Sequence, residues 1–338
     1  MPVRRVLLIA LSAAVAAGQT PAPAPAPATS DADELFKLGQ QLFDQLAPPE
    51  IKAQFEFPSK AQWDAFAARL QHALENDSLE ELAAFGPEAR AVLTALRTLP
   101  GYEDLADWLE QRIDEIEGAR EATAPTAPAP EPRPAPQRPP TAPPATKPPP
   151  TAASRAMPHY DLWLARVRDR PAPARAAALM PRLRAAFAAE GVAPELAWLA
   201  EAESSLNPAA RSPAGAKGLF QFMPDTARSL GLGTFLPDER TDPDKSARAA
   251  ARYLRTLHGR FGNWPLALAA YNAGEGRVGG ALAARGASDF AGVASGLPAE
   301  TRMYVPKVHA LIATRTGVSP EMIAAPRRPT ADARPQNR

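Results

Sequence analysis

Proline is the feature that most constrains how this chain can fold, because it is concentrated in two runs. Thirteen of the 40 prolines fall between residues 121 and 150, and four more fall between residues 21 and 27. Such runs favour extended polyproline II and offer little apolar surface to bury. The 338 residues are therefore expected to form folded blocks joined by stiff tethers. We assign 18–30 as a disordered Pro/Ala-rich segment and 121–155 as a linker. Such a linker is expected to act as a spacer that lets one block move while the other stays bound.

The two ends of the chain have their own compositions. Arg4 and Arg5 precede an apolar run, and Ala14-Val15-Ala16 offers a cleavage site, so residues 1–17 are predicted to be a secretory signal peptide. The run is too short for the ~20 residues of a membrane span. We expect a soluble protein exported to the periplasm or cell envelope, with no membrane span after cleavage and, without cysteine, no lipid anchor at that site. Residues 321–338 read as a disordered tail.

Charge and the reactive residue types exclude several function classes. The chain has 38 Lys and Arg against 37 Asp and Glu, which argues against a nucleic-acid partner. It has no cysteine, which removes disulfide frameworks, thiolate metal sites and cysteine nucleophiles. The four histidines are scattered and never four residues apart, so no metal site is predicted. No cofactor is expected.

The first folded block, 31–120, is predicted to be a small helical bundle. Apolar residues recur at helical spacing in two stretches, namely Trp63, Phe66, Leu70, Leu74 and then Leu105, Leu109, Ile113, Ile116. Trp63 and Trp108 could be ligand platforms, but at this spacing the core is the favoured place for them. The block is acidic and contains no catalytic constellation, so an interaction or positioning role is expected, with a protein partner possible.

The second block, 156–320, contains the candidate chemistry. A helix is predicted from Pro194 to Asn207, and Leu196, Leu199 and Glu203 follow one another at i, i+3 and i+7. Glu203 should therefore share the buried face, where lost hydration raises a carboxyl pKa and suits it to general acid catalysis. Glu201 lies about 200° around the helix and is expected to face solvent. The alternative is that Glu203 is structural, capping a loop or pairing with an arginine.

Other polar side chains in this block could lie close to Glu203 in the folded protein. Gln221 is a lone amide among Leu, Phe and Met residues and needs hydrogen-bond partners if buried. Tyr271 and Asn272 end a helix predicted from Trp264 to Ala273, before a glycine stop. Tyr304 lies on a helix opened by Pro298. Singly, each tyrosine is more readily explained as core; together with Glu203 they could form one cleft.

These segments, in their order, resemble a known family. Four separate motifs resemble the family 1 lytic transglycosylases, most of all the membrane-bound type-D branch. In chain order, they are ESSLNP, SPAGAKGLFQFMP, ALAAYNAGEGRV and PAETRMYVPKV. The resemblance covers about 185–315. It implies an all-α, goose-type-lysozyme-like catalytic domain, here preceded by a small helical bundle and a proline-rich linker.

The family pattern also implies roles for individual residues. Glu203 would be the sole acid and base, and Tyr271 and Asn272 would orient it and the acetamido group of the sugar. The residues implied to bind substrate are Ser212, Gln221, Met223, Tyr271, Asn272 and Tyr304.

The implied partner is the peptidoglycan glycan strand, cut non-hydrolytically at the β-1,4 bond between N-acetylmuramic acid (MurNAc) and N-acetylglucosamine (GlcNAc) to leave a 1,6-anhydro end. One carboxyl group suffices for this reaction, whereas ordinary glycosidases use two. Two alternatives stay open: a goose-type lysozyme-like hydrolase, which a second carboxylate facing Glu203 would favour, and an inactive wall-binding scaffold.

Overall fold

The computed structural model describes most of the two predicted blocks and little of the segments between them. The described residues are 5–6, 40, 44, 49, 55–56, 72–73, 76, 78–97, 103–124, 157–212 and 215–327. Nearly all of the predicted signal peptide and linker, all of 18–30 and the last residues of the tail lie outside these ranges, as does Trp63.

The described elements are almost all helical, which confirms the all-α prediction. Two two-residue strands, β1 (Arg5–Val6) and β2 (Phe55–Glu56), pair in parallel. The first block adds α4 (Leu79–Ala84), α5 (Gly86–Arg97) and α6 (Glu103–Thr123). The second contains α8 (Tyr160–Val167), α9 (Ala176–Ala189), η1 (Pro194–Trp198), α10 (Leu199–Ser204), α11 (Pro224–Ser229), η2 (Glu239–Thr241), α12 (Pro243–Phe261), α13 (Trp264–Ala273), α14 (Glu275–Arg285), α15 (Phe290–Val293), η3 (Ala294–Gly296), α16 (Ala299–Thr316) and η4 (Pro320–Met322).

Side-chain caps set the starts of α12 and α13. The Asp242 carboxylate accepts hydrogen bonds from the backbone N–H groups of Asp244 (2.9 Å) and Lys245 (3.0 Å), ahead of α12. The Asn263 side chain accepts from Leu266 N at 3.0 Å and caps α13. Helix α13 then ends at Gly274, whose φ of 88° suits glycine.

The centre of the second block is formed by α13 and α16, and not by the longer α12. Helix α12 buries one face, which carries Ala247, Ala250 and Leu254, and exposes the opposite one. Helix α16 instead packs against α8, α10, α13 and η1, and its side chains are buried from Met303 through Ile312. A helix apolar around most of its circumference is a core helix.

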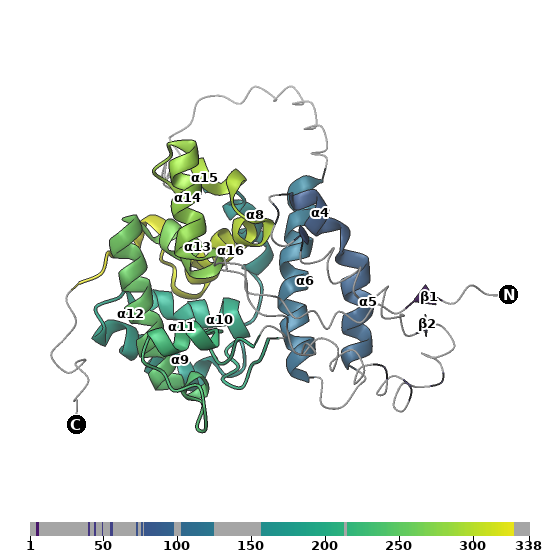
Figure 1. The fold of residues 1–338 in the computed structure, drawn as a ribbon, viewed down its shortest axis with the longest axis horizontal. Helices are drawn as coiled ribbons and strands as arrows, with labels where there is room; N and C mark the ends of the chain where they lie inside the picture. The colour runs from purple at the N-terminus through teal and green to yellow at the C-terminus, as the bar shows by residue number, and fades with distance from the viewer. Residues whose placement is uncertain are drawn as a thin grey trace, which may run out of the picture.

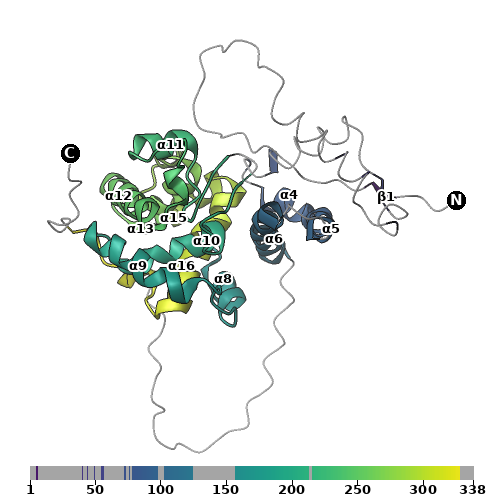
Figure 2. The ribbon, with the colours of Figure 1, turned by 90° about the horizontal axis from the view of Figure 1, so that it is seen from below.

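Helix α6 of the first block packs directly on the second block. It contacts α8, α10 and α16 and lies between α5 and the second block in both ribbon views (Figure 1 and Figure 2). It also continues to Thr123, past the predicted boundary at 120, because no proline interrupts the sequence before Pro125. The two blocks therefore meet at a packed interface, where the proline-rich spacer suggested independent movement.

A seam of charged side chains runs along this interface. The Asp114 carboxylate accepts hydrogen bonds from Arg170 at 2.9 and 2.8 Å and from Arg166 at 3.1 Å. Lys307 of α16 lies 3.2 Å from Glu115 and 3.4 Å from Asp114. Burial opposes ionisation of Asp114, but Lys307 and the two arginines outweigh it and hold its pKa well below the usual range.

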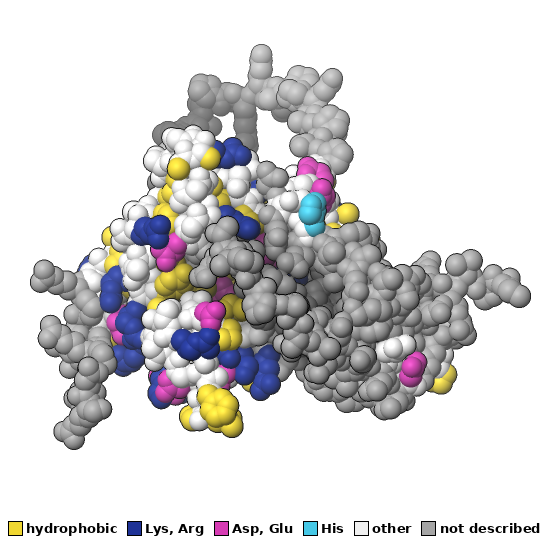
Figure 3. Space-filling model, in the orientation of Figure 1, with side chains coloured by type: hydrophobic (Ala, Val, Ile, Leu, Met, Phe, Trp, Pro, Cys, Tyr) yellow, Lys and Arg dark blue, Asp and Glu magenta, His cyan; other side chains and the backbone are white. Residues whose placement is uncertain are grey.

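The face of the second block seen in Figure 3 is mixed in charge. Figure 3 shows acidic and basic side chains interspersed over the described part of the second block. Within the described ranges, no helix is long and apolar enough to cross a membrane.

We predict that Lys307→Met destabilises the protein by about 1–3 kcal/mol, because Asp114 and Glu115 lose their shared buried cation and keep only their arginine partners. The matched control is Lys245→Met, which breaks an exposed pair with Glu239 and should leave stability nearly unchanged. Urea denaturation of the two variants and wild type measures the difference. Equal midpoints for the two variants would contradict the account of the seam.

Candidate active site

Glu203 lies one residue before the end of α10, at a sharply turned and strained part of the backbone. Ser204 donates its hydroxyl to Leu219 O at 3.0 Å, which ties the helix end to the loop before α11. Ser205 and Leu206 have φ values of 49° and 58°, and Gln221 in that loop has 47°. Left-handed backbone is costly for residues other than glycine and gathers at functional sites.

The Glu203 carboxyl group is half-buried and is held by a tyrosine. The Tyr304 hydroxyl on α16 donates a hydrogen bond to Glu203 Oε1. Burial, with the charge of Glu203 nearby, raises the pKa of Tyr304 well above its ordinary value. Tyr304 is therefore a neutral donor to this carboxyl group at every pH near neutrality.

The pKa of Glu203 is raised from 4.5 to about 7. Burial is the largest cause, and the nearby acids Glu115 and Glu300 add to it. The hydrogen bond from Tyr304 and the positive charge of Arg112 oppose it. A carboxyl group that titrates near 7 can give a proton and take one back at neutral pH.

Tyr271 supports the loop opposite Glu203. Its hydroxyl donates to Phe220 O at 2.7 Å, and its ring packs on those of Phe222 and Tyr253, with centroids 6.2 and 5.5 Å apart. The charge of Glu203 contributes to a raised pKa of the Tyr271 hydroxyl, after burial. Tyr271 thus lies near Glu203 and fixes the loop that carries Gln221.

Asn272 belongs to a second cluster beside the carboxyl group. Its amide donates to Glu300 Oε1 at 3.3 Å, and its Oδ1 accepts from Thr301 Oγ1 at 2.7 Å. Arg112 of α6 pairs with the same Glu300 oxygen. In the part of the chain that the structure describes, Tyr304, rather than Tyr271 or Asn272, makes the hydrogen bond that orients Glu203.

The remaining predicted residues lie on the loop from 208 to 223. Gln221 donates to Gly218 O at 2.8 Å, so the lone amide finds its partner in the backbone of its own loop. The Ser212 hydroxyl accepts from Ala216 N at 3.0 Å. Met223 is half-buried and precedes α11. These contacts shape the loop, and the sugar-binding roles of the three residues stay predictions.

Glu201 does not face solvent, and that expectation is wrong. It is 6% exposed, and Arg315 donates to both of its oxygens, at 2.6 and 2.9 Å. Glu201 and Glu203 both lie in α10, so they do lie on different faces of the helix. The expectation fails because the face that carries Glu201 is covered by the end of α16, which brings Arg315.

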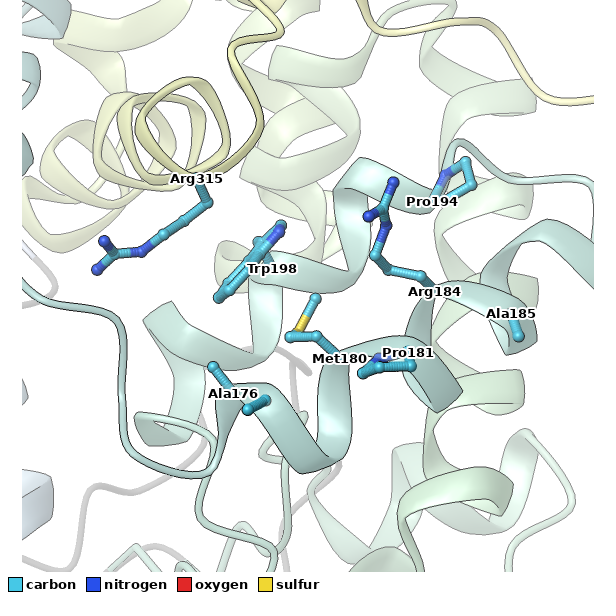
Figure 4. A pocket seen from close by; sticks show the side chains of 9 residues that line it. Ala176, Met180, Pro181, Arg184, Ala185, Pro194, Trp198 and Arg315 are labelled. Carbon is cyan, nitrogen blue, oxygen red and sulfur yellow. The ribbon is translucent and has the colours of Figure 1, made fainter.

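A cavity of about 670 Å³ lies beside this ion pair and not beside Glu203. Figure 4 shows Met180, Arg184, Trp198 and Arg315 around it. Tyr304 and Tyr271 do not line it. The cavity is therefore separate from the candidate active site.

Sequence reasoning missed two residues of the site. In the sequence, Glu300 looks like an ordinary acidic residue in the first turn of a helix. The signal that could have identified it is its position in PAETRMY, four residues before Tyr304. Arg112 could not be found, because it lies in the other block and no local pattern sets it apart.

The comparisons with known proteins match the part of the chain that contains Glu203. The family model described as Transglycosylase SLT domain matches residues 183–292. Membrane-bound lytic murein transglycosylase D of Escherichia coli strain K12 is 45% identical over 123 residues, which is 35% of this chain and 27% of that protein. Soluble lytic murein transglycosylase of Salmonella typhimurium is 38% identical over 118 residues, 32% of this chain and 18% of that protein.

The solved 70 kDa soluble lytic transglycosylase of Escherichia coli aligns with 88% of this chain and 59% of its own, at 18% identity and a TM-score of 0.38. A score this low does not by itself establish a shared fold. The matched segment spans about a quarter or less of the curated relatives' length. The sequence matches agree with the resemblance read from the motifs: this chain contains a transglycosylase SLT domain, of the kind found in lytic murein transglycosylases.

Proposed function

We propose that this protein cleaves the MurNAc-β-1,4-GlcNAc bond of peptidoglycan without water, leaving 1,6-anhydro-MurNAc ends. The observation that carries the proposal is Glu203, a half-buried carboxyl group with a pKa raised to about 7 and a neutral tyrosine holding one oxygen. The transglycosylase SLT match over 183–292 supports the substrate class.

The proposed reaction uses the two protonation states of Glu203 in turn. The protonated carboxyl group gives its proton to the leaving glycosidic oxygen, and the acetamido group of the substrate stabilises the developing oxocarbenium charge. The carboxylate that remains takes the proton of the C6 hydroxyl, whose oxygen then closes the anhydro ring. A pKa near ambient pH makes both transfers accessible. Tyr304 keeps the carboxyl group in one orientation throughout.

The main alternative keeps the fold and lets water attack, as in a goose-type lysozyme. A second carboxylate, Glu300, does lie in the same cluster as Glu203, which is the feature that would favour hydrolysis. Its Oε1, however, accepts from Arg112 and Asn272, and an ion-paired carboxylate is a poor base for water. We therefore favour the non-hydrolytic reaction. An inactive wall-binding scaffold would not need the Tyr304–Glu203 pair.

The envelope location completes the proposal. Peptidoglycan lies outside the cytoplasmic membrane, and the N-terminal sequence from Arg4 to Ala16 fits a signal for export. We propose that the protein acts in the periplasm or envelope during cell wall turnover, as a soluble enzyme that binds glycan strands through the cleft at Glu203.

We predict that Glu203→Gln lowers the release of soluble glycan from purified peptidoglycan by about 10³-fold or more, because the only proton carrier is lost. Glu201→Gln is the matched control, since it removes a carboxyl group two residues away. It should reduce thermal stability by leaving buried Arg315 without its full partner, while the folded protein keeps most of its activity. Comparable losses of activity per folded molecule in both variants would contradict the assignment.

The pH dependence follows from the pKa of Glu203. The first step needs the protonated form, so kcat/KM should fall as the pH rises through about 7. Stability should change with pH in the same direction. A carboxyl pKa raised above 4.5 means that the folded state binds more protons, and its stabilising contribution is lost as the pH rises through about 7.

Glu203→Gln removes this titration, so its stability relative to wild type should be greater at pH 8 than at pH 5. Thermal unfolding of both proteins at the two pH values measures this difference. A wild-type advantage that grew toward pH 8 would show that Glu203 is stabilised as a carboxylate, against the proposal.

A further inference from the structure

Helix α6 brings a positive charge into the active site from the other side of the proline-rich linker. The Arg112 guanidinium pairs with Glu300 of α16 and, at 2.9 Å, with Glu115 on its own helix. Glu300 is in turn bonded to Asn272 at the end of α13. One side chain of the first block therefore connects to two helices of the catalytic block, next to Glu203.

We propose that α6 is a fixed part of the active site, and that Arg112 is a positioning residue that holds Glu300 and Asn272 and supplies the positive charge facing Glu203. The role in catalysis rests on the proposed function. No step of the reaction is assigned to Arg112 itself, which acts through the groups that it holds.

Helix α6 packs too closely on α8 and α16 to dissociate and rebind. Gly118 lies so near α8 and α16 that a Cβ atom there would come within 2.9 Å of Trp163 Cζ2 and 3.0 Å of Met303 Cε. Trp163 is fully buried beneath it. The same helix carries Asp114 and Glu115, which pair with Lys307 of α16 in the charged seam. Close packing and buried ion pairs both favour a permanent interface.

Two further contacts place the first block at the ends of the catalytic helices. Ala299 N, at the start of α16, donates to Asn76 O at 2.7 Å. Gln111 Nε2 approaches the Ser205 hydroxyl at 3.5 Å, two residues after Glu203. The first block thus touches the segments that carry Glu203 and Glu300.

The charge around Glu203 explains why a cation is needed there. The groups that act on its titration come from two helices: Arg112 and Glu115 from α6, and Glu300 and Tyr304 from α16. Arg112 is the one cation of this set, against two other acids and one neutral hydroxyl. Without it, three carboxyl groups would share a half-buried site, and the carboxylate state that the second proton transfer requires would be disfavoured.

The test replaces Arg112 by Gln and by Lys in the full chain. The matched control is Arg97→Gln, which removes an exposed arginine whose partners, Asp107 and Glu110, also lie on α6. The first readout is the titration of the Glu203 side chain by NMR in protein labelled with ¹³C-glutamate, assigned by the signal that Glu203→Gln removes. It needs no substrate. The second is kcat and KM for glycan release.

In Arg112→Gln, Glu203 should titrate at higher pH than in wild type and kcat should fall about tenfold or more, since small displacements of catalytic groups are costly. Arg112→Lys keeps the charge, so the titration should stay near that of wild type while kcat recovers in part. Arg97→Gln should match wild type in both readouts. The proposal is overturned if Arg112→Gln titrates and turns over like Arg97→Gln.

A second pair of variants tests docking without touching a charge. Gly118→Val should push α6 away from Trp163, change the pH at which Glu203 titrates and lower kcat. Gly259→Val on α12, where a Cβ meets no atom within 4 Å, should do neither. An unchanged Glu203 titration in Gly118→Val would contradict a fixed α6. Because the titrations use no substrate, they stay decisive if product analysis shows the proposed reaction to be wrong.

Discussion

The structure depends on the burial of one carboxyl group. Glu203 is half-buried at the end of a short helix. Its loss of hydration raises its pKa by more than the hydrogen bond and the positive charge, which favour the ionised form, lower it. Much of the surrounding architecture serves that position. Ser204 fixes the helix end, Tyr304 fixes one oxygen, and Tyr271 fixes the loop opposite through Phe220 O. A single acid poised in this way can perform both proton transfers that the proposed reaction needs.

The second constraint is electrostatic and joins the two blocks. Acids on α6 meet bases on α8 and α16, and Arg112 on the same helix meets Glu300. Removing either side of such a seam would leave buried charge without a partner, which is far more costly than losing an exposed ion pair. The linker therefore joins two parts that share an interface, and the first block contributes to the surroundings of Glu203.

Sequence alone predicted the parts of the molecule that depend on local signals. Local signals placed the starts of α13 and α16, and the motifs around Glu203, Tyr271 and Tyr304 pointed to one site. Sequence reasoning failed where contacts between residues far apart in the chain determine the structure. Glu201 was misplaced because α16 covers its face of α10 and brings Arg315 to it from 114 positions away. Arg112 was missed because only the docking of α6 brings it to Glu300.

Charge complementarity was the signal that could have revealed this docking. Four acids stand on α6 between residues 114 and 121, and they meet Arg166, Arg170 and Lys307 of the second block. A sequence shows both sets but not that they face each other, and the proline-rich run between them argues for separation.

The central claim is that Glu203 cleaves the glycosidic bond without adding water. Digestion of purified peptidoglycan in H₂¹⁸O, followed by mass spectrometry of the released fragments, tests this directly. The account predicts 1,6-anhydro-MurNAc ends without ¹⁸O, formed by wild type and not by Glu203→Gln. Hydrated MurNAc ends carrying one ¹⁸O atom would show that water is the nucleophile and would contradict it.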